Sequence, residues 1–212
     1  HFSLPVLAAE MPDAAVLITG AAGSIGSELA RQIASNSPSK LILVDRAESE
    51  LFMLQLELQR DFSGVEMEFV VGDVRNSKAM SNLIDRFEVT HLFHAAAFKH
   101  VPLMEQQPTE AIDNNVGSTL NLVRLAGEAG LQRFVLISTD KAVRPSNVMG
   151  ATKRICELLL LDAVLRWPAT RFTAVRFGNV LGSNGSVVPI FRRQLAQGRI
   201  TVTHPDVTRY FM

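Results

Sequence analysis

The chain has 212 residues, 47% of them hydrophobic, which is enough apolar material for one sizeable core and excludes a disordered or fibrous protein. Lys plus Arg and Asp plus Glu number 21 each, so there is no net positive field to gather nucleic acid or anionic lipid. The single cysteine, Cys156, cannot form an internal disulfide, and its place in an apolar helical pattern predicts core packing in a reducing cytosol.

Short apolar runs recur along the chain and predict six buried strands, at residues 15–19, 40–44, 66–71, 91–95, 132–138 and 171–177. Segments with helical spacing of apolar residues lie between them. This alternation predicts an α/β fold, a doubly wound parallel sheet of Rossmann type with helices on both faces. After residue 178, glycines and prolines break the pattern around one short helical stretch, which predicts the start of a smaller substrate-binding part.

The first strand leads into a glycine-rich turn and then directly into a helical pattern. In such a turn one glycine makes the tight bend, another lets the backbone approach a pyrophosphate, and a third lets helix and strand pack closely. Amides at the start of the helix then bind the anion. An ordinary turn is the alternative, but the strand–loop–helix position favours a dinucleotide site at Gly20, Gly23, Ser24, Ile25 and Gly26.

The second strand ends in Asp45, about twenty residues beyond the loop, where a carboxylate accepts hydrogen bonds from the adenosine ribose and repels a 2′-phosphate. Arg46 follows it and is able to accommodate that phosphate, so the sequence favours NAD over NADP without excluding NADP. Asp45 is alternatively a helix cap. After the third strand, Asp73 and Val74 either approach the adenine amino group or form a plain turn.

The ends of the fourth and fifth strands complete the predicted cofactor site. Small side chains after the fourth strand leave room for a flat cofactor or simply fill the core; they are Ala95, Ala96 and Ala97. The fifth strand ends on the carboxyl edge of the sheet, where ligands bind in this architecture, with Ser138, Thr139, Asp140 and Lys141. We therefore expect a tail at 1–12, an NAD-binding domain at 13–178, and the beginning of a truncated substrate-binding region at 179–212.

The glycine loop, the segment STDKA at the end of the fifth strand and the segment MGATK together resemble the extended short-chain dehydrogenase/reductase family. Four stretches are similar to its polysaccharide-biosynthesis branch, which contains UDP-N-acetylglucosamine 4,6-dehydratases: HAAAFKHVPLME, STDKAVRPSNVMGATK, RFGNVLGSNGSVVPIF and ITVTHPDVTRYFM. The resemblance covers nearly all of the chain after residue 13. It implies removal of hydride from sugar carbon 4 to a tightly bound NAD, elimination of water across carbons 5 and 6, and return of hydride to carbon 6.

One position departs from the wider family, which places a tyrosine acid/base four residues before the lysine of the motif. Here that position is Met149, and the only tyrosine is Tyr210. A thioether does not transfer protons usefully at neutral pH, and the membrane-associated dehydratases of this branch share the departure. Met149 either lines the sugar pocket or packs the helix. Asn115, where the wider family has a structural asparagine, either bridges a water or lies at the surface.

The resemblance also implies roles for individual residues. General acid/base work falls on Asp140 and Lys141, with the division between them open, and a solvated ion pair is the alternative. Thr139 is expected to hydrogen-bond the 4-oxygen, and Lys153 to hold the nicotinamide ribose. Donors to the UDP-sugar are expected at Asn179 and Arg209, with Lys99 near the sugar. Arg192 and Arg193 are further candidate donors to the diphosphate of the UDP-sugar, but solvated arginines at the surface explain them as readily.

Two other functions are compatible with these motifs, and no metal site is predicted. A UDP-sugar 4-epimerase would use the same fold, although the missing tyrosine argues against it. A catalytically silent NAD-binding regulator would have kept the fold alone, and the retention of Asp140, Lys141 and Lys153 argues against it.

No apolar run reaches the roughly 18 to 20 residues that span a bilayer, and the first residues lack the layout of a signal peptide. We therefore expect no membrane contact by this part of the protein. The sequence begins without methionine and stops at Met212 within a folded pattern, so we expect a longer protein. By resemblance, that protein carries transmembrane segments before a cytoplasmic catalytic domain at the inner membrane, and forms a homo-oligomer.

Overall fold

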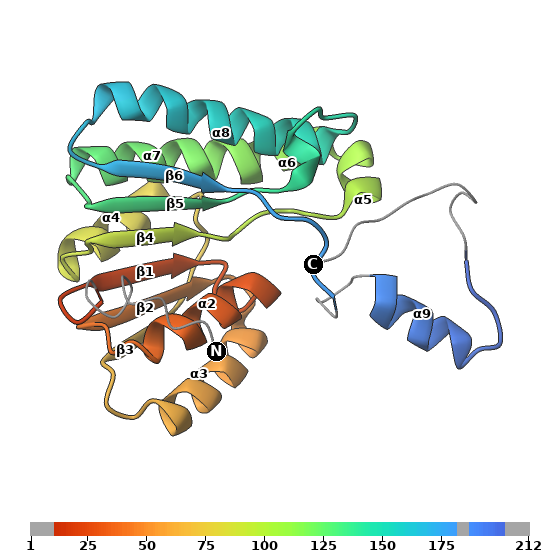
Figure 1. The fold of residues 1–212 in the computed structure, drawn as a ribbon, viewed down its shortest axis with the longest axis horizontal. Helices are drawn as coiled ribbons and strands as arrows, with labels where there is room; N and C mark the ends of the chain where they lie inside the picture. Colours follow the sequence, from red (N-terminus) through yellow and green to blue (C-terminus); the bar gives the residue numbers. More distant parts are fainter. Residues whose placement is uncertain (1–10, 182–186, 202–212) are drawn as a thin grey trace.

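A computed structural model describes residues 11–181 and 187–201 of the chain. Six parallel strands form one sheet in the order β3–β2–β1–β4–β5–β6, and all of them end at the same edge (Figure 1). They are β1 (Ala15–Thr19), β2 (Lys40–Asp45), β3 (Met67–Val71), β4 (His91–His94), β5 (Arg133–Ile137) and β6 (Arg171–Val175). The predicted doubly wound parallel sheet is confirmed, because every predicted strand exists within two residues of its expected bounds. The expectation that all six are buried is wrong for the two edge strands, since β3 has no buried residue and only Phe172 is buried in β6.

Helices cover both faces of the sheet. One face packs against α4 (Ser77–Arg86), α7 (Ser118–Glu128) and α8 (Val148–Arg166). The other face packs against α2 (Ser24–Ala34) and α3 (Glu48–Asp61). The side chains of β1 show why two cores arise: Leu17 belongs to the first, and Val16 and Ile18 belong to the second, since successive side chains of a strand point to opposite faces.

The connections at the carboxyl edge carry shorter elements. After β4 come α5 (Val101–Gln106), α6 (Pro108–Ala111) and the π-helical turn η1 (Ile112–Gly117), which runs into α7. After β5 comes a 3-10 turn, η2 (Asp140–Ala142). The helical stretch expected beyond residue 178 is α9 (Val187–Leu195), which lies apart from the sheet (Figure 1).

Two details differ from the sequence-based expectations. Cys156 is buried as predicted, but its neighbours Ile155 and Leu158 are 42% and 47% exposed, because α8 carries apolar side chains on both of its sides. Met11, inside the expected tail at 1–12, is buried with Ala14 in the core against α2 and α3. Ordered packing therefore begins before residue 13, and the division into domains stays a prediction.

Candidate active site

Two adjoining cavities open at the carboxyl edge of the sheet. The first, of about 150 Å³, lies over the ends of β1, β2 and β3. The second, of about 420 Å³, lies between the glycine loop, the ends of β5 and β6 and the start of α8. Both are lined by Gly20, Gly23, Ala95, Ala97 and Phe98, so one extended ligand is able to enter both.

The glycine loop is able to bring its backbone close to an anion, because it turns tightly at positions where a side chain would not fit. Gly20 has a φ of 70°, and a Cβ there would lie 2.5 Å from the Ala96 nitrogen. A Cβ on Gly26 would overlap the carbonyl oxygen of Gly20. α2 then begins at Ser24 beside the second cavity, and the first amides of a helix have no carbonyl partner within that helix. This arrangement fits the diphosphate of a dinucleotide.

Asp45 connects the glycine loop to the end of β2. Its Oδ2 accepts a hydrogen bond from the Ala22 amide and its Oδ1 accepts one from the Ala47 amide, both at 2.9 Å. The carboxylate also lines the first cavity. The alternative that Asp45 caps a helix is wrong, because the N-cap residue of α3 is Ala47 and no side chain caps that helix. Next to it, the Arg46 guanidinium lies 4.5 Å from the centroid of the Phe98 ring, a cation–π distance.

Asp73 and Val74 also line the first cavity. The Asp73 Oδ1 accepts the Arg75 amide at 2.9 Å, which makes the turn that the sequence left open. The Arg75 guanidinium donates to the same carboxylate at 2.6 Å, and these hydrogen bonds hold the pKa of Asp73 below its usual value. The carboxylate therefore stays ionised beside the cavity.

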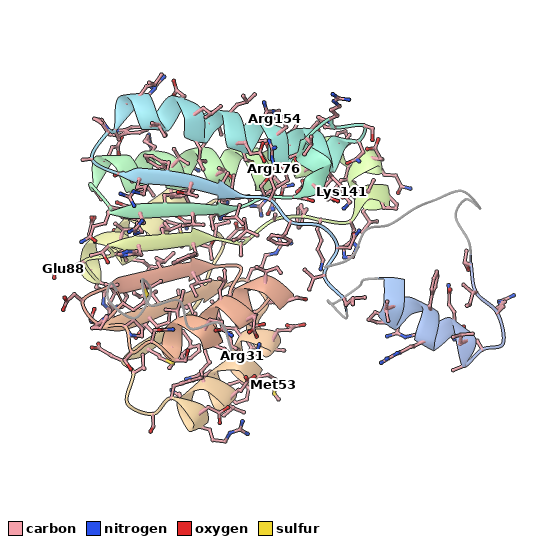
Figure 2. The ribbon with its side chains drawn as sticks, in the orientation of Figure 1. Arg31, Met53, Glu88, Lys141, Arg154 and Arg176 are labelled. Carbon is pink, nitrogen blue, oxygen red and sulfur yellow. The ribbon has the colours of Figure 1, made fainter. Side chains whose placement is uncertain are left out.

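A hydrogen-bonded group forms the wall of the second cavity at the tip of β5. The Lys141 ammonium donates to Asp140 Oδ1 at 2.9 Å and to Asn179 Oδ1 at 3.4 Å, and the Thr139 hydroxyl donates to Asp140 Oδ1 at 2.9 Å. Lys141 faces the side on which the chain leaves β6 (Figure 2). Thr139, Lys141 and Asn179 line the cavity directly, as does Ser138. Asp140 is reached through Thr139 and Lys141.

The charge state of this group follows from its contacts. Burial raises the pKa of Asp140, but hydrogen bonds from Lys141 and Thr139 outweigh burial and hold that pKa below its usual value. Burial lowers the pKa of Lys153, which is only 5% exposed and lines the same cavity. Burial also lowers the pKa of Lys99, another lining residue. The cavity thus combines an ionised carboxylate with partly desolvated amines.

A neutral histidine lies directly behind the glycine loop. His94 is buried, and burial followed by the charge of Lys153 lowers its pKa to about 3. Its Nδ1 lies 2.7 Å from the Thr19 hydroxyl oxygen and its Nε2 lies 3.1 Å from that of Thr119. The ring therefore connects the end of β1 to α7 without adding a charge to the site.

Met149 and Asn115 answer two questions that the sequence left open. Met149 packs against Met104 and also lines the second cavity, so its packing role is confirmed and its place beside the sugar stays a prediction. Asn115 is buried, so the surface alternative is wrong. Its side chain accepts from the Phe98 amide at 2.7 Å and donates to the Phe98 carbonyl at 3.1 Å, which positions the segment that carries Lys99.

The structure brings nearly all of the predicted site residues to the two cavities. The predicted cofactor residues each line one or both cavities: Gly20, Gly23, Ser24, Ile25, Gly26, Asp45, Arg46, Asp73, Val74, Ala95, Ala96, Ala97, Ser138 and Lys153. Arg209 and Tyr210 lie outside the described residues. Arg192 and Arg193 lie on exposed positions of α9 and line neither cavity.

Sequence reasoning missed four residues around the site. Phe98 directly follows the three alanines, and its stacking under Arg46 had no local signal. Gly150 allows α8 to approach η2, since a Cβ there would lie 2.5 Å from the Lys141 carbonyl oxygen. The buried Glu157 forms an ion pair with Arg176, whose side chain is partly exposed, and the signal for it was a carboxylate within the apolar run of α8.

Within 11–181 and 187–201, no group of three or more His, Cys, Asp or Glu side chains is arranged to hold a metal ion. Over the same ranges, every helix is too short or too polar to cross a bilayer.

Comparison with known proteins gives a consistent set of relatives. Residues 16–212 match the family described as polysaccharide biosynthesis protein. The Staphylococcus aureus capsular polysaccharide biosynthesis protein CapD is 47% identical over 215 residues, which cover 100% of this chain and 36% of that protein. A UDP-N-acetylglucosamine 4,6-dehydratase (inverting) of Campylobacter jejuni is 36% identical, over 93% of this chain and 59% of that protein. A UDP-glucose 4-epimerase of Rickettsia canadensis is 38% identical, over 94% and 59%.

A solved structure agrees with this set. The X-ray structure of Pen from Bacillus thuringiensis superposes with a TM-score of 0.89 at 34% identity, over 96% of this chain and 62% of that one. In each of these comparisons the chain spans less than two thirds of the relative's length.

Proposed function

Because this chain belongs to the family of polysaccharide biosynthesis proteins, among the extended short-chain dehydrogenases/reductases, we propose that it is the NAD-binding core of a nucleotide-sugar 4,6-dehydratase acting on a UDP-N-acetylhexosamine. UDP-N-acetylglucosamine is the preferred substrate. The observation that carries the proposal is the hydrogen-bonded group of Thr139, Asp140 and Lys141 beside the second cavity. An elimination needs a proton acceptor and a proton donor side by side, and this group supplies both.

The cofactor has a place in the two cavities. Asp45, Arg46 and Asp73 would hold the adenosine end, and Gly20 with the start of α2 would hold the diphosphate. Lys153 would hold the nicotinamide ribose, since none of residues 11–181 and 187–201 forms an ion pair with its ammonium. NAD, when bound, supplies the hydride acceptor and donor for sugar carbons 4 and 6.

The side chains at the tip of β5 would perform the proton transfers. A 4-ketone acidifies the neighbouring carbon-5 proton, so a modest base is able to remove it, and the departing 6-hydroxyl needs a proton. The Asp140 carboxylate and the Lys141 ammonium are one acceptor and one donor 2.9 Å apart. The Thr139 hydroxyl, which donates to Asp140 in this structure, would turn toward the 4-oxygen and pass the proton lost by the 4-hydroxyl to the Asp140–Lys141 pair. That proton would leave in the water formed from the 6-hydroxyl, and the proton taken from carbon 5 would return to carbon 5 once hydride reaches carbon 6.

A UDP-sugar 4-epimerase is the second candidate, favoured by the likeness to the Rickettsia protein of that name. Such a reaction returns hydride to the opposite face of carbon 4 and needs an acid/base near the 4-oxygen throughout. Met149 lies at the position of the family's tyrosine and cannot transfer a proton. Both reactions begin with oxidation at carbon 4, but only the dehydratase needs a further acid/base pair for carbons 5 and 6. Asp140 and Lys141, 2.9 Å apart, supply that pair, so the dehydratase agrees better with these residues.

The natural full-length protein tests the proposal when it is incubated with NAD and UDP-N-acetylglucosamine and the products are analysed by mass spectrometry. We expect a product lighter by one water. A product of unchanged mass with an inverted 4-hydroxyl would identify an epimerase. If NAD binds and no sugar product forms, the chain is a silent regulator, and the dehydratase assignment fails.

Cofactor preference is expected to depend on Asp45. We expect NAD to bind at least about tenfold more tightly than NADP, because the Asp45 carboxylate repels a 2′-phosphate in the first cavity. Asp45→Asn should narrow this ratio, and Arg46→Met should widen it by removing the nearby cation. Isothermal titration calorimetry with both cofactors measures the ratio. Tighter binding of NADP by the wild-type protein would contradict this assignment.

We also propose that two copies pair through the outward side of α8. Its exposed apolar side chains lie opposite the buried Cys156 and Leu160; they are Ile155, Leu158, Leu161 and Leu165. Helices with apolar side chains on both sides are typically buried on both sides, one against their own domain and one against a partner. Beside these side chains, Asp162 and Arg166 form an ion pair at 2.6 Å. In a two-fold arrangement each copy therefore presents one charge of each sign to the other, which is compatible with pairing.

The paired variant Leu161→Glu with Leu165→Glu is therefore expected to be monomeric, since a dimer would bury carboxylates that have no partner. Size-exclusion chromatography with light scattering measures the mass of the assembly. Leu56→Glu, at an exposed apolar position on α3, is the matched control and should leave the assembly intact. A monomeric wild-type protein at micromolar concentration would refute the pairing.

A further inference from the structure

A buried carboxylate lies behind the wall of the second cavity. Glu157, on α8, has a side chain that is only 6% exposed. It accepts four hydrogen bonds: from the Ser138 hydroxyl at 2.6 Å, from Arg176 Nε at 2.7 Å and Nη2 at 2.6 Å, and from Arg154 Nη1 at 3.0 Å. Figure 2 shows Arg154 and Arg176 close together between α8 and the end of β6. A carboxylate buried to this degree is stable only because these partners replace water.

Each partner of Glu157 stands next to a segment of the site. Ser138 directly precedes Thr139, Asp140 and Lys141, and Arg176 lies three residues before Asn179. Glu157 itself lies one helical turn after Lys153. The carboxylate thus joins the three chain segments that converge on the second cavity.

The same two loops are tied together by their backbones. The Ser138 amide donates to the Val175 carbonyl at 2.7 Å, and the Asp140 amide donates to the Phe177 carbonyl at 3.0 Å. The Lys141 ammonium then reaches Asn179 Oδ1 at 3.4 Å. Any shift of Arg176 relative to Ser138 would therefore move Lys141 relative to Asn179.

Neither Glu157 nor its arginine partners line either cavity, so none of them is placed to touch substrate. We propose that Glu157 is a positioning residue, whose carboxylate holds the Ser138–Lys141 segment and the Arg176–Asn179 segment in register with Lys153 for the proton transfers. The role rests on the proposed dehydratase function. The hydrogen bond from Ser138 to Glu157 has a second consequence. Because the Ser138 hydroxyl donates its proton to Glu157, only its lone pairs are available to a ligand in the cavity. Ser138 is therefore an acceptor for an N–H or O–H of the ligand.

The positioning depends on the charge of Glu157. Hydrogen bonds from Arg176, then from Ser138 and Arg154, lower the pKa of Glu157 to about 2 against the effect of burial, so the group is ionised at every working pH. Glutamine has the same shape and no charge, and its amide nitrogen cannot accept from Arg176. The side chains of Arg176 and Arg154 are 41% and 40% exposed, so water is able to solvate them in a Glu157→Gln variant, and we expect that variant to fold.

Glu157→Gln in the natural full-length protein tests the proposal. We expect kcat for water loss to fall about 10- to 100-fold, with KM for UDP-N-acetylglucosamine and the affinity for NAD nearly unchanged, because geometry rather than binding is lost. Amide hydrogen exchange should accelerate at 138–142 and 176–180 and stay constant at 15–26. The matched control is Glu57→Gln. Glu57 accepts two hydrogen bonds from Arg31, which lies in a different part of the molecule (Figure 2), so this variant also breaks an arginine–carboxylate pair but away from the site.

Two outcomes would overturn the proposal. Unchanged exchange at 138–142 and 176–180 would show that Glu157 does not order these segments. Faster exchange along the whole chain, with unchanged turnover per bound NAD, would show a purely structural role. If the wild-type protein removes no water from the sugar, the proposed function fails, while the exchange pattern still decides whether Glu157 orders the two segments.

Discussion

Replacing Lys141 by methionine is expected to slow water loss from UDP-N-acetylglucosamine by about 1,000-fold while NAD stays bound. Lys141 provides the only ammonium that is hydrogen-bonded to Asp140 among the described residues, so its loss removes one partner of the proposed proton transfers. Asp140→Asn should have an effect of similar size, since an amide cannot take up a proton. Asp45 and the glycine loop are untouched, so the affinity for NAD should be retained.

Mass spectrometry of the sugar nucleotide measures the rate of water loss, and calorimetry measures the binding of NAD. Lys40→Met is the matched control, because Lys40 forms an ion pair with Glu66 at the same 2.9 Å and lines neither cavity. It should turn over as the wild-type protein does. Full activity of either Lys141→Met or Asp140→Asn would remove the basis of the proposed mechanism.

Gly26→Ala is expected to weaken NAD binding by about 100-fold, or about 3 kcal/mol, the upper range for overpacking a tight contact. The added methyl group would overlap the Gly20 carbonyl oxygen, and that oxygen belongs to the backbone of the loop. Gly20 is itself close to other backbone, since a Cβ built on it would lie 2.5 Å from the Ala96 nitrogen, so it has little room to shift. The loop must therefore open, and the site for the diphosphate is lost.

Fluorescence titration with NADH measures the affinity, and thermal unfolding followed by circular dichroism reports whether the variant folds. Gly64→Ala is the control, because a Cβ there would have no neighbour within 4 Å. It should bind as tightly as the wild-type protein. A folded Gly26→Ala protein with unchanged affinity would mean that the dinucleotide does not use this loop.

The strands and the glycine loop could be predicted from the sequence because their causes are local. Parallel strands that are buried on both faces form continuous apolar runs, which made the central strands β1 and β2 recognisable; the edge strands β3 and β6 are less buried but carry short apolar runs of the same kind. Gly20 and Gly26 were recognisable because a residue without a Cβ is required at fixed positions between a strand and a helix. The candidate cofactor residues followed from the same rule, since the ends of parallel strands meet at one edge.

The tertiary structure decided which distant side chains meet. The sequence contains Glu157, Arg176 and Ser138, but only the packing of α8 against β5 and β6 joins them. The contact between Asn115 and Phe98 likewise depends on the π-helical turn before α7. Only the structure shows which apolar side of α8 faces outward, because an apolar pattern that continues around a helix does not say which side meets the sheet. Local sequence thus determined the elements and the cofactor loop, whereas the arrangement of charges behind the site arose from long-range packing, which no spacing along the chain encodes.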